Sequence, residues 1–338
     1  MKKIIGLTLF STFFPLIVYG QLQEINDTIQ SDEYVSLQGE EEFVELQADF
    51  ENNKVTPMPQ EVAKQTYINY DIQYIQSLEG KDEKIIADLN LNDFQSRFAF
   101  LNANTSLHID YNQITYNYVR KYLTYRWYGR LIGLSNYYFP LFEMKLRQYG
   151  LPPELKYLAV VESTLNPRAG SSVGAGGIWQ FMPATGAEYG LWQNQHVSLF
   201  YDPMASTDAA CRYLKKAYGI FKDWNLAISS YNCGAGNVLK AMRRAGSRNY
   251  WEVRPYLPAE TQAYVPSFIA VNYMFNFYDK HGIKPTFFKY SFLQNKIVKI
   301  NTPTYLSTYP YEDKAYLRFA NPHIKNDYIP AGSVIYLK

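Results

Sequence analysis

Apolar residues recur every three or four positions along most of the chain between residues 67 and 278. In YNQITYNYVRKYLTYRWYGRLIGLSNYYFPLFEMKLRQYG, residues 111–150, this spacing predicts two or three amphipathic helices. Further helices are predicted over residues 208–221, 224–231, 236–245 and 258–278. The pattern therefore predicts a mainly α-helical body.

The last fifty residues have a different pattern. KIVKI (296–300), AYLRFA (315–320) and SVIYL (333–337) are short runs that suggest strands. We divide the chain into a leader (1–20), an acidic lead-in (21–55), an N-terminal helical extension (56–104), a helical body (105–282) and a small C-terminal tail (283–338).

The chain begins MKKIIGLTLFSTFFPLIVYGQ, which has two lysines, an uncharged apolar run and a small residue, Gly20. This layout is typical of a cleavable secretory signal, so we expect an exported protein of the cell envelope, soluble after cleavage. Because no cysteine lies near the expected cut, we expect no lipid anchor there. No later run is long and apolar enough for a membrane span.

Charge is unevenly distributed along the chain. Residues 21–54 carry ten acidic residues and one lysine, a balance of −9, whereas residues 55–338 carry +9. The acidic stretch is typical of a disordered lead-in, and the basic remainder suits an anionic polymer. Nucleic acid is disfavoured as a partner, because the chain is predicted to be exported and lacks a recognised basic cluster.

One short helix carries an isolated carboxylate. LPPELKYLAVVEST (151–164) starts with two prolines, and Asn166-Pro167 follows as a stop signal. On such a helix, Glu162 lies on the apolar face with Leu158, near the C-terminus. Burial and the negative helix end would both raise its pKa, as a general acid requires. The alternative is a helix-end glutamate that reaches solvent.

A glycine-rich run follows this helix. SSVGAGGIWQFMPATG (171–186) holds four glycines, which allow a ligand to approach the backbone closely, and Gln180 offers both a donor and an acceptor. The run does not fit a phosphate-binding loop. Histidines, cysteines and carboxylates show no ligand spacing, so we expect no metal and no cofactor. The four histidines are scattered and expected at the surface; Cys211 and Cys233 are either bridged or free.

Five features together resemble the goose-lysozyme-like lytic transglycosylases of family 1: Glu162-Ser163, Ser171, Gly-Gly-Ile-Trp-Gln at 176–180, Tyr231-Asn232 and Tyr264. The resemblance covers roughly residues 105–282. It implies a lysozyme-like helical catalytic domain that acts on peptidoglycan glycan strands. It also implies non-hydrolytic cleavage of the β-1,4 bond between N-acetylmuramic acid and N-acetylglucosamine, leaving a 1,6-anhydro end.

The resemblance implies a role for each matching residue. Glu162 would be the catalytic acid and then the base. Ser171 would position the sugar and Gln180 would hold an N-acetyl group, while Trp179 is either a sugar platform or a core residue.

The remaining matches fall later in the chain. Tyr231 would line the cleft, Asn232 would support its loop, and Tyr264 would orient Glu162. The tail weakly resembles glycan-binding LysM-like modules; the alternative is a strap that packs on the helical body.

Two other functions stay open. A hydrolytic muramidase on the same fold needs a second carboxylate to position water. Its candidates are Glu188, Asp202, Asp208 and Glu260. Of these, Asp202 is expected to start a turn or helix, Asp208 to be an early-helix charge, and Glu260 to lie in the first turn of the last helix. A cell-wall binding protein without catalytic activity is the other alternative.

Overall fold

The computed structural model describes residues 88–125, 128–285, 288, 290–309 and 314–338. The predicted leader, the acidic lead-in and most of the N-terminal extension lie outside these residues.

The described chain is mainly helical, as predicted. The longer α-helices are α3 (Leu91–Asn104), α4 (Gln113–Tyr122), α5 (Tyr128–Gln148), α8 (Pro203–Phe221), α9 (Trp224–Cys233), α10 (Ala235–Ala245) and α12 (Ala259–Phe277). The shorter ones are α6 (Tyr157–Ser163), α7 (Pro183–Glu188), α11 (Tyr250–Val253) and α13 (Lys314–Ala320). Short 3-10 helices cover Pro153–Lys156, Arg254–Tyr256, Tyr278–His281, Phe292–Gln294 and Leu306–Thr308.

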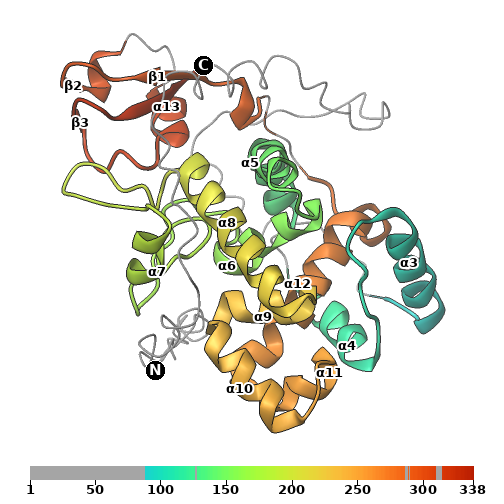
Figure 1. Ribbon diagram of the computed structural model, residues 1–338. Helices are drawn as coiled ribbons and strands as arrows, with labels where there is room; N and C mark the ends of the chain where they lie inside the picture. Colours follow the sequence, from blue (N-terminus) through green and yellow to red (C-terminus); the bar gives the residue numbers. More distant parts are fainter. Residues whose placement is uncertain (1–87, 126–127, 286–287, 289, 310–313) are drawn as a thin grey trace, which may run out of the picture.

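Helix α12 lies at the centre of the body. It is apolar around most of its circumference, as expected of a helix buried on all sides. Figure 1 shows α12 between α9 and α4, and it also packs on α6. Phe98 of α3 stacks on Tyr273 of α12, with ring centroids 5.7 Å apart. Residues from α6 and α12 are therefore held side by side inside one hydrophobic core.

The long helix α8 begins earlier than the periodicity predicts. Asp202 is its N-cap and accepts hydrogen bonds from the amides of Met204 and Ala205 at 2.8 and 3.1 Å. Pro203 occupies the first helical turn, where its missing N–H costs nothing. Asp202 thus has the helix-start role that the sequence indicates.

The tail folds against the helical body (Figure 1). Strand β1 (Lys296–Lys299) pairs antiparallel with β4 (Val334–Leu337), and β2 (Thr304–Tyr305) pairs with β3 (Tyr328–Ile329). The strand prediction is wrong for AYLRFA, which forms α13. Its buried residues Tyr316, Leu317, Phe319 and Ala320 have helical spacing, and this spacing outweighs the strand propensity of the run.

The surface prediction for the histidines is wrong for two of them. His281 and His323 are 0% and 1% exposed. The Nε2 atom of His281 lies 2.9 Å from the Tyr273 hydroxyl oxygen, and that of His323 lies 2.8 Å from the Val334 carbonyl oxygen. These contacts satisfy one nitrogen of each buried ring, and the sequence does not show the neighbours that make them. Both cysteines are free thiols.

Position 177, in the glycine-rich loop, can accommodate only glycine. Its φ is +85°, and a Cβ added there would lie 1.8 Å from the Phe200 carbonyl oxygen. The amide of Gly177 donates to the Ala169 carbonyl oxygen at 2.8 Å, which fixes the loop on that backbone. The glycine therefore allows the loop to pack directly on the chain before α8.

We predict that Gly177→Ala lowers the free energy of unfolding by about 3 kcal/mol or more, since backbone strain and a backbone collision add. Gly190→Ala is the matched control, because Gly190 has φ +79° but nothing within 4 Å of the added Cβ. That variant should lose only about 1 kcal/mol. Equal losses, measured by chemical denaturation, would contradict the collision.

Candidate active site

Glu162 lies in the last turn of α6. The helix ends at Thr164, whose backbone is left-handed (φ 52°), and Leu165 is left-handed too (φ 60°). Such conformations are strained for residues with a Cβ, and strain of this kind is concentrated at functional sites. The double left-handed turn directs the chain away from α6 immediately after Glu162.

The Glu162 carboxyl is buried, with 8% of the residue exposed. Burial raises its pKa to about 8, and the nearby Glu260 carboxylate contributes in the same direction. The Tyr264 hydroxyl donates a hydrogen bond to Glu162 Oε1, which opposes this rise by favouring the charged form. Glu162 is therefore protonated at neutral pH and can donate a proton.

Tyr264 and Glu260 lie one turn apart on α12. The i, i+4 spacing places both side chains on one face of the helix. Burial raises the pKa of the Glu260 carboxyl, whereas a hydrogen bond from Asn232 lowers it. Glu260 thus places a second carboxyl group close to Glu162. Among the carboxylates that the sequence offers as a base for water, Glu260 is thus the one near Glu162, and its i, i+4 spacing to Tyr264 indicates the shared helix face.

Tyr231 and Asn232 come from the end of α9. The Tyr231 hydroxyl donates to the Trp179 carbonyl oxygen at 2.9 Å. Burial raises the pKa of Tyr231, and the Glu162 carboxylate contributes in the same direction. Asn232 Nδ2 donates to Glu260 Oε1 at 3.0 Å, and its Oδ1 accepts from the buried Thr261 hydroxyl at 2.6 Å. Asn232 therefore joins α9 to the start of α12. No pattern in the sequence predicts this role for Thr261.

Gln180 is held within the glycine-rich loop. It is 8% exposed and left-handed, with φ 49°. Its Nε2 donates to the carbonyl oxygens of Gly177 and Ala169 at 2.7 and 3.2 Å. Ser163, next to Glu162, donates through Oγ to the Ile178 carbonyl oxygen at 2.8 Å. The loop is thereby tied to the end of α6 that carries Glu162.

Ser171 shapes the same loop. Its Oγ accepts from the Ala175 amide at 2.8 Å, and its own amide donates to the Ala175 carbonyl oxygen at 2.9 Å. The structure thus brings Tyr264 into direct contact with Glu162, places Tyr231 within electrostatic reach of it, and connects Asn232 to the start of α12 through Glu260 and Thr261. It connects Ser171 to them only through the loop.

The platform interpretation of Trp179 is wrong. The side chain is 0% exposed, and its Nε1 donates to the buried Thr207 hydroxyl at 2.9 Å. Its ring centroid lies 5.1 Å from that of Phe142 on α5. Trp179 is a core residue, because its side chain is buried against α5 and α8.

The other candidate carboxylates have structural positions. Asp202 caps α8, and Glu188 is an exposed residue at the end of α7. Asp208 pairs with Lys145 at 3.1 Å and with Arg212 at 2.9 Å, and these cations lower its pKa against the effect of burial. Of these four acids, only Glu260 acts on the pKa of Glu162.

Within the described ranges, no three or more histidine, cysteine or acidic side chains are grouped so that they could hold a metal ion. In the same part of the chain, no helix combines the length and apolar character needed to cross a membrane.

Comparison with known proteins agrees with this geometry. Residues 140–254 match the family model described as the transglycosylase SLT domain. Over 145 residues the chain is 35% identical to membrane-bound lytic murein transglycosylase D of Escherichia coli K12, covering 41% of this chain and 32% of that protein. The chain thus spans about a third of that relative's length.

Two solved structures show more distant similarity. The 70 kDa soluble lytic transglycosylase of Escherichia coli has 21% identity and a TM-score of 0.39, covering 59% of this chain and 32% of that one. An inactive variant of lytic transglycosylase Slt from Pseudomonas aeruginosa has 21% identity and a TM-score of 0.37, covering 43% and 24%. The family model and the sequence relative thus agree: residues 140–254 of this chain are similar to the transglycosylase SLT domain.

Proposed function

We propose that this protein is a peptidoglycan lytic transglycosylase, with residues 105–282 as its catalytic domain. The observation that carries the proposal is one buried carboxyl group, Glu162, which is protonated at neutral pH and receives a hydrogen bond from Tyr264. The SLT domain match over residues 140–254 supports the substrate class. The substrate is the glycan strand of peptidoglycan, and the site of action is the cell envelope.

In the proposed reaction, Glu162 donates its proton to the oxygen of the β-1,4 bond between N-acetylmuramic acid and N-acetylglucosamine. The bond from the muramyl anomeric carbon to that oxygen breaks, and the N-acetylglucosamine side leaves with the proton. The muramyl C6 hydroxyl then attacks the same anomeric carbon and loses its proton to Glu162. The product is a 1,6-anhydro end, and Glu162 is protonated again.

One carboxyl group suffices for this reaction because the acceptor belongs to the substrate. A hydrolytic glycosidase needs a second carboxylate as nucleophile or as base for water. An intramolecular hydroxyl reacts at a high effective concentration and needs only a base, a role that Glu162 can take after it has given up its proton.

The neighbouring residues prepare this group. Tyr264 fixes the orientation of the carboxyl group, and Tyr231 lines the cleft beside it. Asn232 holds the start of α12, which carries Tyr264, through Glu260 and Thr261. Gln180, whose amide nitrogen bonds the loop backbone, presents its carbonyl oxygen to an N-acetyl group. Ser171 positions the sugar from the same loop.

A hydrolytic muramidase is the second candidate, and one observation favours considering it. Glu260 is a carboxylate close enough to Glu162 to raise its pKa, so it could activate water. Against this, Asn232 already bonds one Glu260 oxygen, and the carboxylate lies beside Tyr264 on the same helix face.

The first test is the identity of the products. We predict that the chain lacking residues 1–20, incubated with purified sacculi, releases muropeptides one water lighter than hydrolytic products and resistant to borohydride. Glu162→Gln should lower their release by about 1,000-fold or more, because it removes both acid and base. Mass spectrometry distinguishes the outcomes: reducible ends would indicate the muramidase. Binding to sacculi without release would indicate the binding protein.

The second test is the pH dependence of activity. Glu162 must start protonated, so kcat/KM should be level below pH 8 and fall as pH rises through its pKa of about 8. Tyr264→Phe removes a hydrogen bond that lowers this pKa, so the fall should move to higher pH as the rate decreases. Tyr138→Phe is the control, since it removes another buried hydroxyl, one that has no hydrogen-bond partner among the described residues. A profile unchanged by Tyr264→Phe would contradict the assigned contact.

The third test concerns Glu260. Removing its charge by Glu260→Gln should lower the pKa of Glu162, so the alkaline fall in kcat/KM should move to lower pH, opposite to the effect of Tyr264→Phe. The products should still be anhydro forms. Glu188→Gln, which neutralises an exposed acid of α7, should change neither property. If Glu260→Gln abolished turnover of a reaction that gives reducible ends, Glu260 would be the base of a hydrolase.

A further inference from the structure

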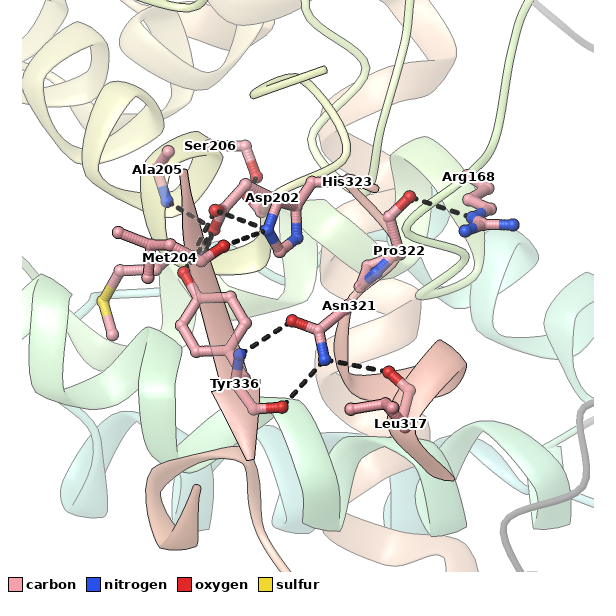
Figure 2. A network of polar contacts seen from close by, with 11 residues as sticks. Arg168, Asp202, Met204, Ala205, Ser206, Leu317, Asn321, Pro322, His323 and Tyr336 are labelled. Atoms are coloured by element: carbon pink, nitrogen blue, oxygen red, sulfur yellow. Dashed lines mark hydrogen bonds and ion pairs between the residues drawn. The ribbon is translucent and has the colours of Figure 1, made fainter. Parts of the chain in front are cut away.

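The end of the tail shares a buried carboxylate with the helical body. Figure 2 shows Tyr336 of β4 pointing at Asp202, and its hydroxyl oxygen lies 2.8 and 3.0 Å from the two carboxylate oxygens. The same carboxylate caps α8. Asn321 binds the backbone of Tyr336 in both directions, at 2.7 and 2.8 Å. This network fixes the segment around residue 321 relative to α8.

The segment held in this way runs between two loops of the body. On one side, the Ser198 amide donates to the His323 carbonyl oxygen at 3.0 Å, and the Lys325 amide donates to that of His196 at 2.7 Å. Lys325 Nζ also donates to the Asn194 carbonyl oxygen at 2.8 Å. Residues 323–325 thus continue the backbone pairing of the loop over residues 193–198.

On its other side, the segment binds Arg168. The guanidinium donates through Nε to the Pro322 carbonyl oxygen at 2.9 Å (Figure 2). It also donates through Nη2 to the Ile324 carbonyl oxygen at 3.0 Å. A planar guanidinium that bonds two carbonyls, two residues apart, is fixed in direction as well as position. Arg168 lies in the loop that connects α6 to the glycine-rich run.

The residue after Arg168 holds the glycine-rich loop. The Ala169 carbonyl oxygen accepts from the Gly177 amide at 2.8 Å and from Gln180 Nε2 at 3.2 Å. A displacement of Arg168 therefore moves the acceptor on which Gln180 rests. The tail is connected to Gln180 by hydrogen bonds from Arg168 to Pro322 and Ile324, by the peptide bond from Arg168 to Ala169, and by the hydrogen bond from Gln180 to Ala169.

We infer that the tail is a strap that holds the glycine-rich loop in position, and that Arg168 is a positioning residue that acts through Gln180. The inference rests on the proposed function for its catalytic meaning. It gives the carbonyl groups of Pro322 and Ile324, which hold Arg168, a role in substrate binding without contact to substrate. It also predicts that the effect of Arg168 appears in KM, because Gln180 would hold the substrate in the ground state and the transition state alike.

The test is a double-mutant cycle on the mature chain with solubilised glycan strands. Arg168→Met should raise KM about 10-fold with kcat changed less than about 3-fold, as expected for lost uniform binding. In a Gln180→Ala background, the same change should alter KM by less than about 2-fold, since both act on one contact. Lys325→Met is the matched control: it removes a cation that bonds a carbonyl across the same interface but ends at Asn194, and it should leave KM unchanged.

Two results would overturn the inference. One is an Arg168→Met enzyme with the KM of Lys325→Met, and the other is the full Arg168→Met effect persisting in the Gln180→Ala background. If Arg168→Met does not fold, Arg168→Lys takes its place, because a single ammonium group cannot reproduce the two-carbonyl fork and should give an intermediate KM.

Failure of the proposed function is recognised separately, because the unaltered chain would then release no anhydro products. The structural part is tested without activity by amide hydrogen exchange. Gly177 donates to Ala169, so its amide should exchange faster in Arg168→Met and not in Lys325→Met. Unchanged exchange at Gly177 in both variants would overturn the strap.

Discussion

The burial of one carboxyl group, Glu162 against Tyr264, is the interaction on which the site depends. A charged carboxylate in that position would be costly, so the group keeps its proton instead. This requires burial, which the hydrophobic core around α6 and α12 supplies. Tyr264 can reach Glu162 only because α12 passes directly over the end of α6. The helical packing therefore sets the proton affinity of the site.

The backbone around the site is strained where it turns. Thr164, Leu165 and Gln180 are all left-handed although each has a Cβ, and such residues cost about 1–2 kcal/mol apiece. The first two turn the chain at the end of α6, and the third lies where the loop returns. The surrounding hydrogen bonds from Ser163 and Gln180 hold these conformations in place. The strained backbone close to Glu162 therefore lowers the stability of the fold, and packing in the core compensates for this loss.

The sequence was sufficient to predict the main helices of the body, but not how the glycine-rich loop and the tail pack against them. Helical periodicity correctly indicated α8, α9, α10 and α12, and the prolines before α6 placed Glu162 at a helix end. It could not show that Trp179 points inward, because a glycine-rich loop has no periodicity that distinguishes its two faces. The strand prediction for AYLRFA was wrong for a related reason. A run of that length fits either a strand or a helix, and packing against the body decides which of the two forms.

The pairing of Tyr336 with Asp202 joins residues 134 positions apart in the sequence. Tyr336 and Phe319 belong to the same hydrophobic core as Tyr138 and Phe142 of α5. A ribosome that has made only the family-matched region has therefore produced a domain whose core is still open on one side. The final packing around the start of α8 forms after synthesis has passed β4, so contacts made late in folding complete a core whose first helices emerge early.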